Sequence, residues 1–243
     1  MSDKSVSART LAILERYLAR DVKIVIATAR PPRSALPGVL NNICNHIVCY
    51  NGAEIYNKTS LLHKQHIPAT IVKRIVDGFH KLDSKIQIAL EIDDQLFANY
   101  DISINGWVPP YSQVDFCYFN YRSTAKVLVN FQSRETVPSF RETLPDECVM
   151  VVTDDDSLGQ IMHKGVSKAN AAIYFLQMYG YGPEDVIAFG DDYNDVDLLT
   201  RCGIGVAMGN ARSEIKEVAD IIAPSNDDDG VAYVLEKLAA QKL

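Results

Sequence analysis

The sequence lacks the features of a secreted or membrane protein. Its 243 residues contain only five cysteines, and an odd number without metal-site spacing favours a reducing compartment over a disulfide framework. No apolar run is long enough to cross a bilayer, and no signal peptide opens the chain. We therefore expect a cytoplasmic protein with no membrane partner. The cysteines are Cys44, Cys49, Cys117, Cys148 and Cys202.

Positive charge is also scarce. Lys and Arg total 24 against 31 Asp and Glu, and the formal net charge of −7 argues against nonspecific binding to nucleic acid. The hydrophobic share of 47% and the charged share of 23% are ordinary for a soluble globular protein, and the length suits one large domain or two modest ones. No pattern in the sequence indicates an oligomeric state.

A cluster of acidic residues follows a short apolar segment near residue 190. Residues 186–189 are predicted to form a buried strand that ends at Gly190, and an apolar helical pattern begins at Val196. Because open α/β sheets bind ligands at the carboxyl ends of their strands, and oxygen ligands suit Mg²⁺, the turn is a candidate metal site. The alternative is that Asp191 and Asp195 only cap the helix and favour its positive end. The carboxylates of the turn are Asp191, Asp192, Asp195 and Asp197.

A hydroxyl and a guanidinium follow another predicted buried strand. Residues 22–27 are rich in Val and Ile, and the sequence Thr28-Ala29-Arg30 comes next, before two prolines that end the strand. Because Arg offers a bidentate fork to phosphate oxygens, this loop is a candidate phosphate cradle. The alternative is a loop arginine that pairs with an acidic side chain.

A turn signal follows the next predicted strand, at residues 46–50. Asn51-Gly52 is first of all a turn sequence, and it becomes a ligand site only with further support. Residues 53–56 and 61–67 are then predicted to form a hairpin. The other elements predicted in the flanking segments are helices at 7–20, 33–42, 210–219 and 230–240 and strands at 204–208 and 221–223.

A lysine occupies the first turn of a predicted helix that Ser167 caps and Gly180 ends. The helix dipole is already positive at that end, so Lys168 is placed against the local field. Its position makes sense if an anion lies between the lysine and the helix. The alternative is a solvated lysine that costs a few tenths of a kcal/mol.

The hydrophobic pattern changes between residues 68 and 154. The segment begins with apolar residues at helical spacing, and residues 86–92 then alternate strictly, as a half-buried strand does. Further elements are predicted as strands at 96–100, 126–132 and 148–152, a helix at 135–144 and irregular structure at 101–114. A mixed sheet with helices on one side is an α+β layer. We therefore predict an inserted domain at 68–154 between two core segments, 1–67 and 155–243.

These signals, in this order, resemble the haloacid dehalogenase (HAD) superfamily of phosphatases, in its Cof-type branch. The likeness covers nearly the whole chain, although the inserted domain matches in layout more than in motif. It implies an α/β fold, in which a Rossmann-like parallel sheet forms the core and the insertion forms an α+β cap. The matching stretches are Ala27-Thr-Ala-Arg30, Tyr50-Asn-Gly-Ala53, Gly165-Val-Ser-Lys168, Gly190-Asp-Asp-Tyr-Asn-Asp195 and the ending at 225–232.

The resemblance implies a Mg²⁺-dependent phosphomonoesterase that works through an aspartyl-phosphate. Asp191 would bind Mg²⁺ directly, and Asp195 would support the metal through water. Lys168 would neutralise charge on the phosphoryl group and the nucleophile, and Thr28 would donate a hydrogen bond to a phosphoryl oxygen. Phosphoryl transfer needs neutralised equatorial oxygens and a fixed geometry, so these groups suit the reaction. The residues that the resemblance places on the substrate side are Arg30, Asn51, Gly52 and Asn194.

One family motif has no counterpart. The family opens with a strand followed by Asp-x-Asp-Gly-Thr, which carries the nucleophile and the general acid/base, whereas this chain opens with Met1-Ser-Asp-Lys. Asp3 does not replace the motif, because no strand precedes it and no carboxylate follows two residues later. The expected strand would lie between those that end at Thr28 and Asp191. We therefore expect the chain alone to lack aspartyl-phosphate chemistry and to be marginally stable, through a start codon assigned too late or a truncated gene.

Three functions share this set of residues. The first is a phosphatase of small phosphate esters such as sugar phosphates, the second a non-catalytic phosphate-ester-binding or regulatory protein, and the third a phosphomutase. All three imply a small phosphorylated metabolite as partner. We expect specificity to depend on cap loops near Trp107 and Tyr111, which do not identify the substrate.

Overall fold

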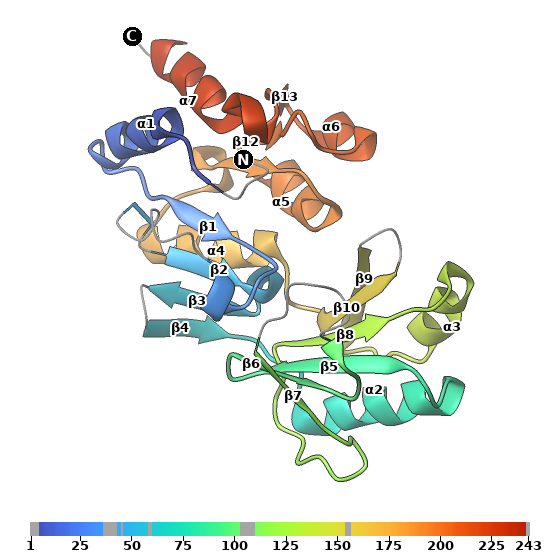
Figure 1. Ribbon diagram of the computed structural model, residues 1–243. Helices are drawn as coiled ribbons and strands as arrows, with labels where there is room; N and C mark the ends of the chain where they lie inside the picture. Colours follow the sequence, from blue (N-terminus) through green and yellow to red (C-terminus); the bar gives the residue numbers. More distant parts are fainter. Residues whose placement is uncertain are drawn as a thin grey trace. The chain divides into compact units, whose positions relative to one another are not determined.

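The computed structural model describes residues 5–35, 43–44, 46–57, 60–102, 110–153 and 157–241. The chain divides into two compact units (Figure 1). Unit 1 comprises Met1–Arg30, Ser34–Leu62 and Ser167–Leu243, and unit 2 comprises Pro31–Arg33 and His63–Val166. None of the helices in the described segments is both long and apolar enough to cross a membrane.

Unit 1 contains two sheets. The first has the order β1-β2-β3-β4, with β1 and β2 parallel and β2 and β3 antiparallel. The second is parallel, with the order β11-β12-β13. The strands are β1 (Val25–Ala27), β2 (His46–Cys49), β3 (Glu54–Asn57), β4 (Ser60–Lys64), β11 (Ile187–Gly190), β12 (Ile204–Ala207) and β13 (Ile221–Ile222). The α-helices are α1 (Ala8–Leu18), α4 (Lys168–Tyr179), α5 (Val196–Arg201), α6 (Ser213–Val218) and α7 (Gly230–Gln241).

Local capping signals fix the ends of two of these helices. The Ser7 side chain accepts a hydrogen bond from the N–H of Thr10 at the start of α1. Ser167 does the same for Asn170 at the start of α4, and Gly180 ends α4 in the left-handed conformation, with φ 71°. These caps satisfy backbone groups that a helix end leaves without intrahelical partners. The predicted caps and the predicted C-terminal glycine are confirmed.

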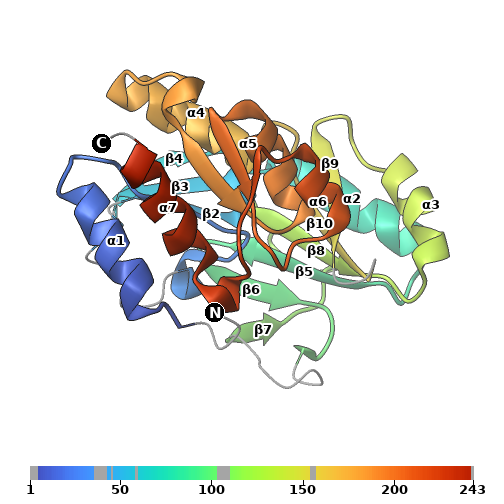
Figure 2. The ribbon, with the colours of Figure 1, turned by 90° about the horizontal axis from the view of Figure 1, so that it is seen from above.

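The two sheets of unit 1 do not share a ladder in the described segments. β1 pairs with β2 alone, and β11 pairs with β12 alone. Helix α1 contacts both sheets, because Leu14 packs with Ile24 and Ile26 in one apolar cluster and with Phe189 in another. Helix α7 lies beside α1 (Figure 2), and the Tyr17 hydroxyl donates a hydrogen bond to the Leu235 carbonyl over 2.8 Å. The further strand that the family resemblance predicts between these sheets is not among the described strands.

Unit 2 is an α+β layer built on one six-stranded sheet. Its strand order is β7-β6-β5-β8-β10-β9, and only the β6–β7 pair is parallel. Alternate residues such as Ile88, Leu90 and Val127 pack against Phe79 and Phe140 of the helices. The strands are β5 (Gln87–Ile92), β6 (Gln95–Ala98), β7 (Tyr111–Gln113), β8 (Lys126–Asn130), β9 (Cys148–Thr153) and β10 (Leu158–His163), and the α-helices are α2 (Ala69–Leu82) and α3 (Val137–Glu142).

Two predictions about local structure need correction. The segment 158–163, predicted to belong to the core, is strand β10 of unit 2, because Ile161 pairs with both Val127 and Met150. The segment 101–114, predicted to be irregular, contains β7, which pairs with β6. Most of the helix predicted at 33–42 cannot be compared, because 36–42 lie outside the described residues, as does Trp107; the described part contains a 3₁₀ turn at Pro32–Ser34. Unit 2 includes the described part of 68–154 and extends beyond it on both sides.

Candidate active site

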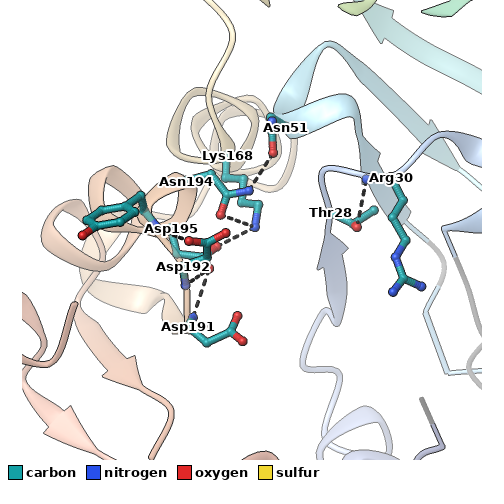
Figure 3. A network of polar contacts seen from close by, with 9 residues as sticks. Thr28, Arg30, Asn51, Lys168, Asp191, Asp192, Asn194 and Asp195 are labelled. Carbon is teal, nitrogen blue, oxygen red and sulfur yellow. Dashed lines mark hydrogen bonds and ion pairs between the residues drawn. The ribbon is translucent and has the colours of Figure 1, made fainter. Parts of the chain in front are cut away.

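The acidic turn after β11 folds around the buried carboxylate of Asp195. Its Oδ2 accepts hydrogen bonds from the N–H groups of Asp191 (3.1 Å) and Asp192 (3.2 Å), as Figure 3 shows. Asp192 in turn accepts from the N–H of Tyr193 over 2.8 Å. The alternative, in which Asp191 and Asp195 cap the helix, therefore applies to Asp195, which forms a capping box with Asp192. The cap leaves the Asp191 side chain outside this hydrogen-bonding arrangement.

Lys168 forms an ion pair with the same carboxylate. Its Nζ lies 2.6 Å from Asp195 Oδ1, and the two side chains are only 8% and 6% exposed. Nζ also donates to Oδ1 of Asn194 over 3.3 Å. The structure therefore overturns the alternative of a solvated lysine. A buried cation placed beside a helix N-terminus needs a negative partner, and Asp195 supplies one.

Asn194 connects this ion pair to the loop after β2. Because a lysine can only donate, the Asn194 atom that faces it is the carbonyl oxygen, and its amide NH₂ group is directed to Asn51. Asn194 Nδ2 donates to Asn51 Oδ1 over 2.9 Å. Asn51 is in the left-handed region, with φ 61°.

Gly52 allows the same loop to reach the start of α4. Its φ is 116°, and a Cβ atom at this position would lie 2.4 Å from the carbonyl oxygen of Ser167. Both the conformation and the close approach exclude a larger residue without rearrangement. The loop after β2 and the helix that carries Lys168 are thus in direct contact.

Thr28 and Arg30 lie on the loop after β1. The Arg30 N–H donates to Thr28 Oγ1 over 3.1 Å, and the Asn51 N–H donates to the Thr28 carbonyl over 2.9 Å. Asn51 therefore connects the two loops, because its backbone N–H contacts Thr28 and its side chain contacts Asn194 beside Lys168. The Arg30 guanidinium is exposed and is directed away from Lys168 (Figure 3). Within the described segments no carboxylate pairs with Arg30, so the structure does not support the alternative of a paired loop arginine.

Asp191 is the carboxylate of the turn that remains available for a ligand. Partial removal from water raises its pKa, and the neighbouring charge of Asp195 raises the pKa further, while Lys168 opposes both effects. The charged form of a carboxylate in such a setting is stabilised by an added cation. Asn210 Nδ2 donates to Asp191 Oδ2 over 3.3 Å.

The donor set fits a magnesium ion held largely by water and substrate. No group of three or more His, Cys, Asp or Glu side chains could hold a metal among the described residues. Mg²⁺ is commonly bound by one or two carboxylates together with waters and substrate phosphates. Both Asp195 oxygens are engaged by Lys168 and by backbone N–H groups, so Asp191 is better placed than Asp195 to bind a metal directly.

Asn210 is not among the residues that the sequence predicts for the site. Its side chain contacts Asp191, a predicted metal ligand, from the loop after β12. The available signal was its position just beyond a predicted buried strand, where the other candidate residues also lie. Asn-type residues are so common in turns that this signal alone has little specificity.

Comparisons with known proteins agree on one family. Residues 1–235 match the model of the haloacid dehalogenase-like hydrolases. The chain is 28% identical to the 5-amino-6-(5-phospho-D-ribitylamino)uracil phosphatase YitU of Bacillus subtilis, over 97% of this chain and 92% of that protein.

Solved structures show the same fold. A haloacid dehalogenase-like hydrolase from Bacteroides thetaiotaomicron is 25% identical and has a TM-score of 0.82, over 98% of this chain and 94% of that one. A sugar phosphatase of HAD subclass IIB has a TM-score of 0.83 at 22% identity, over 96% of this chain and 92% of that one. The predicted α/β class, with a parallel-sheet core, is confirmed.

Proposed function

Because this chain belongs to the haloacid dehalogenase-like hydrolases, we propose that it acts on small phosphate monoesters, such as sugar phosphates, as a Mg²⁺-dependent phosphatase. The observation that carries the proposal is the buried Lys168–Asp195 pair at the carboxyl end of β11. Asn194 ties this pair to the loops after β2 and β1. The names of the two phosphatase relatives support the substrate class.

The side chains have complementary roles in this proposal. Lys168 neutralises charge on the phosphoryl oxygens, and Asp195 holds the Lys168 ammonium in place. Thr28 donates a hydrogen bond from its hydroxyl to another phosphoryl oxygen, while its Oγ1 accepts a hydrogen bond from the Arg30 N–H. Asn194 and Asn51 orient the ester. Such preorganised charges and donors are the main protein contribution to phosphoryl transfer.

Asp191 would hold Mg²⁺, with Asp195 supporting it through water. The ion would supply Lewis-acid stabilisation of the phosphoryl oxygens. Arg30 and Gly52 complete the predicted substrate side, where Gly52 brings the loop against the start of α4. The guanidinium of Arg30 contributes only if its exposed side chain turns toward the ester.

A second candidate is a phosphate-ester-binding protein without turnover. Two carboxylates of the turn are already committed, because Asp195 pairs with Lys168 and Asp192 caps the turn. The third, Asp191, is the proposed metal ligand. In this second candidate none of the described carboxylates acts as the nucleophile, and the described groups bind the ester without cleaving it.

Phosphate release and binding distinguish the two candidates. Release from p-nitrophenyl phosphate and a panel of sugar phosphates is measured with Mg²⁺, and ester binding is measured by calorimetry. Asp191→Ala is the test variant, and Asp197→Asn is the control, because Asp197 lies nearby in the first turn of α5 but forms an exposed pair with Arg201. Turnover that Asp191→Ala abolishes supports the phosphatase. Saturable binding without turnover supports the binder, and neither binding nor turnover would refute both.

A further inference from the structure

The Asn210 side chain bridges two loops at the candidate metal site. Its Oδ1 accepts a hydrogen bond from the backbone N–H of Asn226 over 2.9 Å. Its Nδ2 donates to Oδ2 of Asp191 over 3.3 Å. Asn226 is the first residue of a 3₁₀ turn, Asn226–Asp228, that precedes α7. One amide therefore connects the C-terminal part of the chain to the carboxylate that follows β11.

The chemistry of the contacts fixes which way the Asn210 amide points. A backbone N–H can only donate, so the Asn210 atom that faces Asn226 must be the carbonyl oxygen. The NH₂ group then necessarily faces Asp191, whose ionised carboxylate can only accept. Reversing the amide would place two donors together at one end and two acceptors at the other. The N–H of Asn226 thus sets the orientation in which Asn210 presents a donor to Asp191.

The backbone around Asn210 is also held on several sides. The Gly209 N–H donates to the Pro224 carbonyl over 3.1 Å, and Lys216 Nζ donates to the Gly209 carbonyl over 2.7 Å. A Cβ atom on Gly209 would lie 2.7 Å from the backbone nitrogen of Ser225, so only glycine permits this approach. Asn210 itself is exposed, and burial does not explain why its side chain is so constrained.

We propose that Asn210 is a positioning residue that holds the Asp191 carboxylate in its metal-binding orientation, and that Asn226 fixes Asn210 through its backbone N–H. The inference rests on the proposed role of Asp191 as a Mg²⁺ ligand. An aspartate that is free to rotate loses conformational entropy when it binds a cation, whereas a carboxylate already held by a donor loses less. Partners that orient a metal ligand typically change metal affinity about 10–100-fold when removed.

Two substitutions break the connection at different points. Asn210→Ala removes both hydrogen bonds. Asn226→Pro leaves Asn210 intact and removes the N–H that orients it. Proline suits the first position of a helical turn, and Ser225 has φ −65° and ψ 167°, the extended conformation that a residue before proline prefers. Asn226→Ala is the matched control, because it removes the same side chain and keeps the N–H.

The test measures Mn²⁺ affinity from the free-ion signal in electron paramagnetic resonance, without any substrate, together with the melting temperature. We expect Asn210→Ala to weaken Mn²⁺ binding about tenfold. Asn226→Pro should weaken it in the same direction, and Asn226→Ala should leave it unchanged. The double variant Asn210→Ala with Asn226→Pro should bind no more weakly than Asn210→Ala alone, because both changes act through one contact.

Asp191→Asn separates a failure of this inference from a failure of the proposed function. If the protein does not bind Mn²⁺, or if Asp191→Asn leaves the affinity unchanged, Asp191 is not a metal ligand and both proposals fall. If Asp191→Asn abolishes binding but Asn210→Ala retains full affinity, only the positioning role of Asn210 is overturned. Additive losses in the double variant would show that Asn226 acts independently of Asn210, which would overturn the second half of the proposal.

Discussion

Replacing Lys168 by methionine should destabilise unit 1 strongly, because it leaves the charge of Asp195 buried without its partner. Removing one member of a buried ion pair costs about 3–5 kcal/mol. Asp195 keeps two backbone N–H donors, at 3.1 and 3.2 Å, so we expect the lower end of that range, about 3 kcal/mol. At about 2–4 °C per kcal/mol, the melting temperature should fall by about 6–12 °C.

The chain contains a matched control for this substitution. Lys73 and Asp77 on α2 form an ion pair with the same 2.6 Å distance, but their side chains are 57% and 50% exposed. Exposed helix pairs of this kind contribute about 0.3–0.5 kcal/mol, so Lys73→Met should change stability by about that amount. The N–O distance is the same in the two ion pairs, so the comparison tests the effect of burial.

Urea denaturation followed by circular dichroism measures both variants. Asp195→Asn and the double variant complete a thermodynamic cycle, in which the coupling energy should be well above that of an exposed pair. The reasoning would be refuted if Lys168→Met lost less than about 1 kcal/mol, the upper end for exposed pairs. Phosphate-ester binding should also be lost in Lys168→Met while Lys73→Met retains it.

Two further predictions concern residues outside the ion pair. Burial, and then the charge of Lys23, lower the pKa of His46 in the folded state. The unfolded chain therefore binds more protons, and stability should decrease as the pH falls through and below the ordinary histidine range. Denaturation at pH 5 and 8 should show this loss of stability, and His46→Phe should reduce the loss. Gly52→Ala should cost more than about 1 kcal/mol by denaturation, because of the φ of 116° and the contact with Ser167. Gly78→Ala, in α2 with no atom near the added Cβ, should instead stabilise the protein by about 0.5–1 kcal/mol; equal effects at the two glycines would contradict this account.

The sequence predicted the elements whose signals are local. Ser167 and Gly180 mark the ends of α4 because a helix cap depends on residues within one turn. The strand β10 was missed because Gly159 and Gln160 interrupt its apolar pattern, and its assignment depends on ladders with β8 and β9, which are distant in sequence. Strands of this kind are defined by pairing more than by composition.

The candidate site shows the same contrast between local signals and contacts that are distant in sequence. The types of its residues and their order could be predicted from the sequence. Lys168, for example, stood out because a lysine in the first turn of a helix is placed against the helix dipole. The contacts that define the site were not readable. The Lys168 and Asp195 side chains meet across 27 positions of sequence, and Asn210 reaches Asp191 across 19. Only the folded chain shows that Asp195 pairs with Lys168 and that Asp191 remains available for a ligand.

The charges of the site argue that anion binding depends on a cation. Lys168 contributes one positive charge, and Asp191, Asp192 and Asp195 contribute three negative charges, so the local sum is 1 − 3 = −2. The exposed guanidinium of Arg30 is directed away and reduces this sum little. A phosphate monoester is itself close to dianionic at neutral pH, and repulsion would exclude it from such a site. A divalent ion held by Asp191 would cancel the local excess of negative charge, and we therefore expect phosphate esters to bind with Mg²⁺ present and to dissociate when it is chelated.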